Sequence, residues 1–156
     1  MKRSDHAYYK ERACQILAAR EHSAAELFRK LLQRGCPADT ASQVVAGLID
    51  AGLIDDVRFA VMLLRSKFRQ GWGWHRVLAE LRKRGVGDEA IAAVVSECAD
   101  ELGEEREEER AAEIVRRRMH SAADADKVLR YLLNHGFSAV VSRRVVTQYL
   151  ECNREA

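Results

Sequence analysis

Apolar residues recur along most of this 156-residue chain with the spacing of an α-helix. In one segment they stand at positions i, i+1, i+4 and i+5, which are Leu27, Phe28, Leu31 and Leu32. Such positions share one face of a helix, whereas in a strand they would fall on both faces. The same spacing returns in Val44, Val45, Leu48 and Ile49. Abundant Ala, Leu, Arg and Glu and a single proline also favour helices, so the sequence predicts an all-α protein.

Three segments of the chain align with one another without gaps. They are LLQRGCPADTASQVVAGL from Leu31, LRKRGVGDEAIAAVVSEC from Leu81 and LLNHGFSAVVSRRVVTQY from Leu132. Successive copies begin 50 and 51 residues apart, which indicates tandem repeats. We expect each repeat to bury its leucine together with one valine. These valines are Val45, Val95 and Val146.

Each copy predicts three helices, so we expect three tandem three-helix repeats, nine helices in all, forming an elongated, curved helical protein. The repeats span residues 7–52, 55–99 and 107–152. Tails are expected at 1–6 and 153–156, and an acidic connector at 100–106.

Local signals agree with these helices. Ser23 and Glu26 have the spacing of a capping box, and Asp55 with Asp56 marks another helix start. Glycines stand where periodic segments end, as helix stops should. They are Gly35, Gly52, Gly71, Gly85 and Gly136.

The connector lies within ECADELGEEREEER, in which eight acidic residues face two basic ones. Acidic side chains near a helix N-terminus are stabilised by the helix dipole, so we interpret this run as a solvated helix start. An acidic contact surface is the alternative.

Composition excludes several classes of protein. The 26 Lys or Arg nearly balance the 24 Asp or Glu, so net charge identifies no partner. The four cysteines form no CxxC pair, and we expect buried or half-buried thiols instead of a metal or redox site. No motif for a metal, a nucleotide phosphate or a nucleophile with its base occurs, which argues against an enzyme and against a cofactor. No apolar run reaches the roughly 18 residues of a membrane span, so we expect a cytoplasmic protein without a membrane partner.

The most basic segment is RSKFRQGWGWHRVLAELRKRG, residues 65–85, with seven Lys or Arg against one Glu. A helix C-terminus accounts for one or two cations but not for seven, so we predict that this cluster contacts an acidic partner. We expect Trp72 to pack between helices and Trp74 to be the more exposed tryptophan. The candidate contact residues are Arg65, Lys67, Arg69, Trp74, Arg76, Arg82, Lys83 and Arg84.

Two stretches of the chain resemble the RecX family of RecA regulators. AREHSAAELFRKLLQRG is similar to the family's opening repeat, and LIDAGLIDDVRFAVMLLRSKFRQGWGWHRVLAELRKRGV to its central motif. The specific elements are Gly52, Asp55, Asp56, Arg58, Phe59, Ala60, Gly71, Gly73, Arg76, Glu80, Leu81, Gly85 and Val86. In one departure from the pattern, Trp74 stands where a proline commonly follows the second glycine.

The resemblance implies tandem three-helix repeats, in agreement with the periodicity. It also implies binding to the RecA protein and to the RecA–single-stranded DNA filament, with inhibition of strand exchange, ATP hydrolysis and coprotease activity. We expect a monomer, and leave open whether DNA is contacted directly. Two alternatives are a stand-alone helix-turn-helix DNA-binding protein and a protein-only helical scaffold. Within the motif, we expect Arg58 to make a local ion pair or cap contact that joins the first two repeats.

Overall fold

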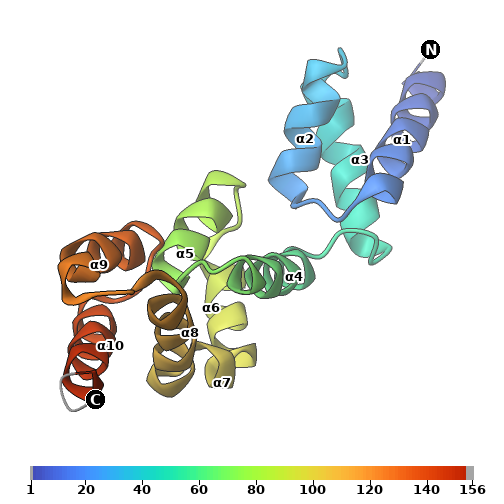
Figure 1. Cartoon of the computed structure of the whole chain (residues 1–156). Helices are drawn as coiled ribbons and strands as arrows, with labels where there is room; N and C mark the ends of the chain where they lie inside the picture. The colour runs from blue at the N-terminus through green and yellow to red at the C-terminus, as the bar shows by residue number, and fades with distance from the viewer. Residues whose placement is uncertain (1, 154–156) are drawn as a thin grey trace. The chain divides into compact units, whose positions relative to one another are not determined.

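The computed structural model describes residues 2–153, and their side chains from residue 5 onward (Figure 1). Ten α-helices and one short 3-10 helix make up the regular structure of these residues, which contain no strand. The prediction of an all-α protein is confirmed. No helix in the described part of the chain is long and apolar enough to span a bilayer.

The chain divides into two compact units. Unit 1 consists of the residues up to Met62 together with Leu81–Ala93, and unit 2 of Leu63–Glu80 together with the residues from Val94 onward. The helices up to the middle of the chain are α1 (Lys2–Ala19), α2 (Ala24–Gln33), α3 (Ala38–Asp50), α4 (Asp56–Arg69), α5 (Trp74–Lys83) and α6 (Asp88–Glu97). They are followed by α7 (Ala99–Leu102), α8 (Glu104–Arg118), η1 (Ala122–Asp124), α9 (Ala125–Asn134) and α10 (Ala139–Cys152).

The helix boundaries differ from the expected nine helices at two places. Helix α1 begins at Lys2, within the tail expected at 1–6, while Met1 and residues 154–156 lie outside the described residues. The stretch expected as an acidic connector, 100–106, contains most of α7 and the start of α8. Glu104, Glu105 and Glu107 stand in the first turn of α8, where the helix dipole favours negative charge.

The core of unit 1 lies among α1, α2 and α3 (Figure 1). Its largest fully buried side chains include Leu27, Leu31 and Leu48, with Val44 and Val45 beside them. The apolar face predicted from the helical period therefore points inward. Helix α2 begins with the predicted capping box, in which Ser23 Oγ accepts from the Glu26 amide (3.1 Å) and the Glu26 carboxylate accepts from the Ser23 amide (3.3 Å).

Arg58 makes the local contacts predicted for it. Its Nε donates to the Glu21 carboxylate, between α1 and α2, over 3.0 Å, and its Nη1 donates to the Gly52 carbonyl over 3.2 Å. The Arg58 amide donates to Asp55 Oδ1 at the start of α4, as a capped helix requires. These bonds link the loop before α2 to the first turn of α4 within unit 1.

The core of unit 2 lies among α8, α9 and α10 (Figure 1). Val115, Leu132, Val141 and Val145 are buried there, and the Tyr149 hydroxyl donates to the Met119 carbonyl over 2.9 Å. Leu132 is fully buried, as are Leu31 and Leu81, so all three leucines of the sequence alignment are core residues.

Glycine supplies the backbone conformation at each predicted helix stop. Five glycines have positive φ, between 71° and 88°. They are Gly35, Gly52, Gly71, Gly85 and Gly136. Side chains with a Cβ rarely adopt this conformation, which explains why the stops could be located from the sequence.

Glycines also permit a close approach between neighbouring segments in each unit. In unit 2 the Gly73 amide donates to the His135 carbonyl (2.7 Å) and the His75 amide to the Gly136 carbonyl (3.1 Å). A Cβ on Gly73 or Gly136 would come closer than 3.0 Å to the facing backbone. In unit 1, a Cβ on Gly85 would come closer than 3.0 Å to the Cβ of Ala25, and the neighbouring Arg84 carbonyl accepts from Ser23 Oγ over 2.5 Å.

Three predictions of burial are wrong, those for Val95, Cys14 and Cys152. Val95 is 42% exposed, and it is the preceding residue, Val94, that is fully buried. Consecutive helical residues point about 100° apart, so both are buried only where a helix is covered over a wide face, as α3 and α10 are. For the same reason Cys14, which follows the buried Ala13, is exposed.

Among the other thiols, Cys36 and Cys98 are buried as expected, whereas Cys152 is exposed. All four cysteines are free. Burial raises the pKa of the Cys36 and Cys98 thiols, so both are protonated at neutral pH and behave as small apolar side chains.

Candidate functional site

The basic segment predicted as a contact surface is divided between the two units. Unit 2 contains Arg65, Lys67, Arg69, Trp74 and Arg76. Unit 1 contains Arg82, Lys83 and Arg84, at the end of α5 and just after it.

Trp72 organises two of the predicted cations. The Arg76 guanidinium lies 3.8 Å from the centroid of the Trp72 ring, and Lys67 Nζ lies 4.4 Å from it. Cations over an indole are stabilised by its π face, so Trp72 has the structural role expected for it. Trp74 is half-buried, as Trp72 is, so neither tryptophan is fully exposed. Trp74 stands between Gly73 and His75, whose amides are bonded to the turn after α9.

Several of the remaining cations are held by carboxylates. Arg65 donates to Glu101 through Nη2 (2.8 Å) and Nε (3.0 Å), and this bond with its charge raises the pKa of Arg65. Arg84 pairs with Glu26 at 3.0 Å. Arg82 lies 3.9 Å from Asp88, a weak and exposed pair. Arg69 is exposed and belongs to a larger basic groove in unit 2.

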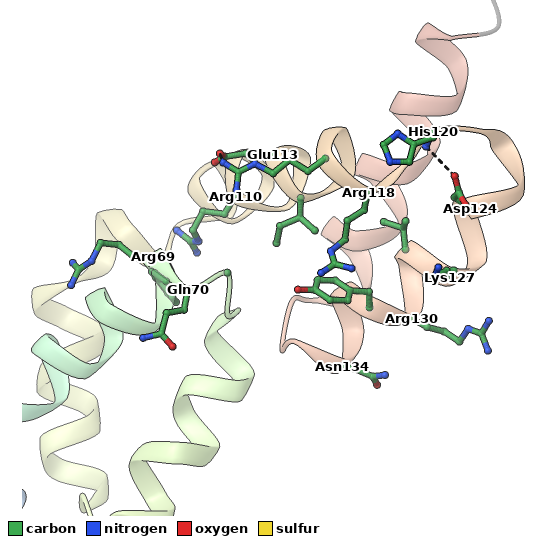
Figure 2. A pocket seen from close by; sticks show the side chains of 16 residues that line it. Arg69, Gln70, Arg110, Glu113, Arg118, His120, Asp124, Lys127, Arg130 and Asn134 are labelled. Atoms are coloured by element: carbon green, nitrogen blue, oxygen red, sulfur yellow. Dashed lines mark hydrogen bonds and ion pairs between the residues drawn. The ribbon is translucent and has the colours of Figure 1, made fainter.

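This groove, which we call the α8/α9 groove, has a volume of about 1070 Å³ and is shown in Figure 2. Its floor and walls come from α8, α9 and the C-terminal end of α4. Six lining residues are basic, namely Arg69, Arg110, Arg117, Arg118, Lys127 and Arg130. Two are acidic, Glu113 and Asp124.

Both acids are engaged in local structure. Glu113 forms an ion pair with Arg117, one helical turn away. The Asp124 carboxylate accepts from the amides of His120 and Ser121, each over 3.0 Å, and these bonds lower the pKa of Asp124. Asp124 is therefore ionised and serves the helix start, which leaves the other five cations without a carboxylate from the groove lining.

Aromatic rings orient two of these arginines. Arg118 reaches from α8 toward α9 and lies 3.6 Å from the centroid of the Tyr131 ring (Figure 2). Tyr131 in turn stacks on His135, with centroids 3.8 Å apart. A guanidinium stacked on a ring keeps the N–H groups of its edge free to bind an anion.

Arg110 lies at the other end of the groove and is partly buried. Its guanidinium lies 3.9 Å from the Phe68 centroid, and Nη1 donates to the Glu101 carbonyl over 2.9 Å. Its Nε is buried and has no hydrogen-bond partner within the described residues. Burial lowers the pKa of Arg110 while Glu107 and Glu101 oppose the shift, and a guanidinium remains charged at neutral pH.

The arrangement suits the binding of an extended anion. Guanidinium and ammonium groups spaced along an open groove match the repeated charge of a phosphodiester backbone. Within residues 5–153, no three His, Cys, Asp or Glu side chains lie close enough to hold a metal ion.

Most of this groove was missed from the sequence. Of its six cations only Arg69 was among the candidates. The run VRRRMH, residues 115–120, was a local signal of positive charge. The acidic stretch before it masked that signal. Its carboxylates do not line the groove, and three of them, Glu104, Glu105 and Glu107, stand in the first turn of α8.

Comparisons with known proteins identify relatives along most of the chain. The family models described as RecX, first three-helix domain, and RecX, second three-helix domain, match residues 10–48 and 55–95. Regulatory protein RecX of Stenotrophomonas maltophilia (strain R551-3) is 38% identical over 144 residues, which is 89% of this chain and 85% of that protein. Regulatory protein RecX of Halorhodospira halophila (strain DSM 244 / SL1) is 36% identical over 137 residues, 83% and 81% of the two chains.

A solved structure shares the fold. The crystal structure of RecX from Lactobacillus salivarius has a TM-score of 0.76 at 22% sequence identity. The similarity covers 93% of this chain and 96% of that one.

Proposed function

The chain belongs to the RecX family, and we propose on that basis that it is a non-enzymatic regulator of the RecA recombinase. In this proposal it binds RecA and the RecA filament on single-stranded DNA, and it inhibits strand exchange, ATP hydrolysis and coprotease activity. It acts in the cytoplasm as a monomer built of three repeats, at residues 7–52, 55–99 and 107–152.

The observation that supports this proposal most directly is the excess of cations in the α8/α9 groove. A regulator of a filament on DNA meets phosphates at regular intervals, and basic side chains that neutralise them gain affinity by releasing counterions. Arg69, Lys127 and Arg130 are the groove cations that we propose as direct contacts, because they are exposed.

The basic segment at residues 65–85 has a more limited role in this proposal. Arg65, Arg76 and Arg84 are held within the protein by Glu101, Trp72 and Glu26. Lys83 is exposed, and we propose it as a contact in unit 1.

The helix-turn-helix alternative receives less support from the side chains of α6. In such a module the N-terminal residues of the recognition helix contact base edges. The third helix of the second matched domain is α6, and its first turn carries Asp88 and Glu89, both exposed. Carboxylates at these positions would be repelled by the DNA phosphates that flank the major groove.

RecA-dependent ATP hydrolysis on single-stranded DNA tests the proposal. The full chain is added in increasing amounts, and the hydrolysis rate is expected to fall as the chain approaches the concentration of RecA. The variant Lys127→Gln/Arg130→Gln should inhibit less, while Lys10→Gln/Arg29→Gln, which removes the same charge from exposed positions of unit 1, should inhibit as the parent does. A rate that stays constant up to a molar excess of the parent chain would refute the proposed function.

A further inference from the structure

Two stretches of the chain, residues 12–22 and 110–120, have related sequences. RACQILAAREH belongs to α1 and the loop after it, and RAAEIVRRRMH to α8 and the loop after it. Aligned without a gap, they are identical at five positions: Arg12 and Arg110, Ala13 and Ala111, Ile16 and Ile114, Arg20 and Arg118, His22 and His120. Both alanines are fully buried, so the two helices face their own cores in the same register.

The matched residues line a groove in each unit. In unit 2 they are Arg110, Ile114, Arg118 and His120, all in the α8/α9 groove. In unit 1 their counterparts are Arg12, Ile16, Arg20 and His22, and they line a groove of about 430 Å³ against α2, which we call the α1/α2 groove. Each groove therefore lies between a long helix and the shorter helix that follows it.

The α1/α2 groove is basic, and the described residues that line it include no acidic one. Its cations are Arg12, Arg20, Lys30 and Arg34. Among the residues with described side chains, Arg20 alone of these four has a carboxylate within reach, Glu26 at 3.4 Å, and that carboxylate is also bonded to Arg84 at 3.0 Å.

The other three cations are oriented by neutral acceptors among the described residues. Arg12 Nη1 donates to the Gln15 amide oxygen over 3.2 Å, and Arg34 Nη1 donates to the Lys30 carbonyl over 3.3 Å. Neutral acceptors fix a side chain without cancelling its charge. Three positive charges are thus presented to the groove with no opposing charge in its lining.

His22 fixes the ammonium of Lys30. His22 is 1% exposed, its Nδ1 lies 2.8 Å from the Arg20 carbonyl, and its Nε2 lies 2.8 Å from Lys30 Nζ. A carbonyl only accepts, so Nδ1 carries the proton and Nε2 accepts from Lys30. Binding an anion at this site therefore requires less loss of side-chain freedom than binding by an unrestrained lysine.

We propose that the α1/α2 groove is a second binding site for the phosphodiester backbone of single-stranded nucleic acid, formed by Arg12, Lys30 and Arg34. Single-stranded nucleic acid fits because an aromatic ring flanks the cations. Tyr8 is 51% exposed, one turn before Arg12, whose guanidinium lies 5.2 Å from its centroid. Basic grooves bordered by exposed aromatic rings are typical of proteins that bind single strands.

With the α8/α9 groove, the chain then has one nucleic-acid site in each compact unit. The proposal shares its ligand with the proposed function but requires no RecA, so it is tested with DNA alone.

The experiment measures fluorescence anisotropy of a labelled oligothymidylate of about 15 nucleotides. The labelled oligonucleotide is titrated with the full chain at several salt concentrations. The test variant is Arg12→Gln/Arg34→Gln, at two exposed positions of the groove. The matched control is Lys10→Gln/Arg29→Gln, which removes the same charge from exposed residues of the same unit outside the groove. Circular dichroism and thermal unfolding confirm that both variants are folded.

The expected result is weaker binding by the test variant at low salt. The plot of log K against log salt concentration should also become less steep by about 1.4, because each lost phosphate contact to a single strand removes about 0.7 from the magnitude of the slope. The control should keep the slope of the parent. Equal slopes for parent, control and test variant would overturn the proposal, even if RecA inhibition is intact. An unchanged slope for DNA, together with lost binding of a labelled polyglutamate peptide, would overturn it in favour of an acidic protein partner.

Discussion

The Gly73 amide donates a 2.7 Å hydrogen bond to the carbonyl of His135, two residues far apart in the chain. In the repeat alignment Gly73 corresponds to Ser23 and His135 to Arg84, and Ser23 Oγ donates to the Arg84 carbonyl over 2.5 Å. The same junction therefore occurs in each unit, between the residue before a helix and the end of the equivalent helix one repeat later. Gly73, the second glycine of the GWGW segment, therefore makes a main-chain contact.

Gly73→Ala should destabilise the protein because its Cβ would meet the backbone of Gly136 and Phe137. Backbone cannot move aside as the end of a flexible side chain can, so we expect a loss of about 2 kcal/mol or more in the free energy of unfolding. Urea denaturation followed by circular dichroism measures it. Gly87→Ala is the matched control, because a Cβ there meets nothing within 4 Å. Equal stability of the two variants would contradict the close approach at Gly73.

Leu81→Ala should cost about 2–5 kcal/mol of unfolding free energy, because Leu81 is fully buried. Val95→Ala should cost much less, because Val95 is 42% exposed. Thermal and denaturant unfolding of the two variants distinguish these positions. A large loss at Val95 would show that this valine is covered in solution.

Arg58→Ala should lower the free energy of unfolding by about 1 kcal/mol, a modest loss because the ion pair with Glu21 is partly exposed. Arg58→Lys retains the charge but lacks the planar guanidinium that contacts Glu21 and the Gly52 carbonyl. Its free energy of unfolding should therefore lie between those of the parent and Arg58→Ala. Both variants should inhibit RecA as the parent does. A stable Arg58→Ala variant without inhibition would instead identify Arg58 as a partner contact.

Stability should fall as the pH drops below about 6.5, the usual pKa of histidine. Burial lowers the pKa of His22, and the charges of Arg20 and Lys30 add to that shift against the opposing Arg20 carbonyl and Glu26. The unfolded chain then binds a proton that the folded chain does not, so stability decreases until the folded His22 itself is protonated.

Unfolding measured at several pH values checks this dependence. His22→Gln should reduce the slope of stability against pH between about pH 7 and 5. Glu26 affects the stability of the protein at lower pH than His22 does. Burial would raise its pKa, but bonds and charge from Arg20, Ser23 and Arg84 lower it, so its contribution is lost only below about pH 4.3. A slope unaffected by His22→Gln would contradict the burial of a neutral imidazole.

The parts of the fold that depend on local chemistry could be predicted from the sequence. Helical spacing located Leu31, Leu81 and Leu132 in the core, and the need for positive φ located the glycine stops. Val95 was misjudged because the width of the covered face of α6 depends on neighbours distant in the chain.

The site depended still more on distant contacts. Arg65 was a candidate for binding, but its partner Glu101 follows 36 residues later. The α8/α9 groove combines α8 and α9 with the end of α4, and no single stretch of sequence contains all its cations. The basic character of residues 65–85 is therefore visible in one segment of sequence, whereas the groove forms only when distant segments fold together.

The junction at Gly73 and Gly136 has a consequence for how such a chain can change over evolutionary time. Its hydrogen bonds run between main-chain atoms, and its closeness depends on the absence of side chains. Substitutions on the outward faces of α8 and α9 leave these atoms untouched. The charge of the groove can therefore change to suit a different partner while the junction between the start of α5 and the end of α9 keeps its geometry.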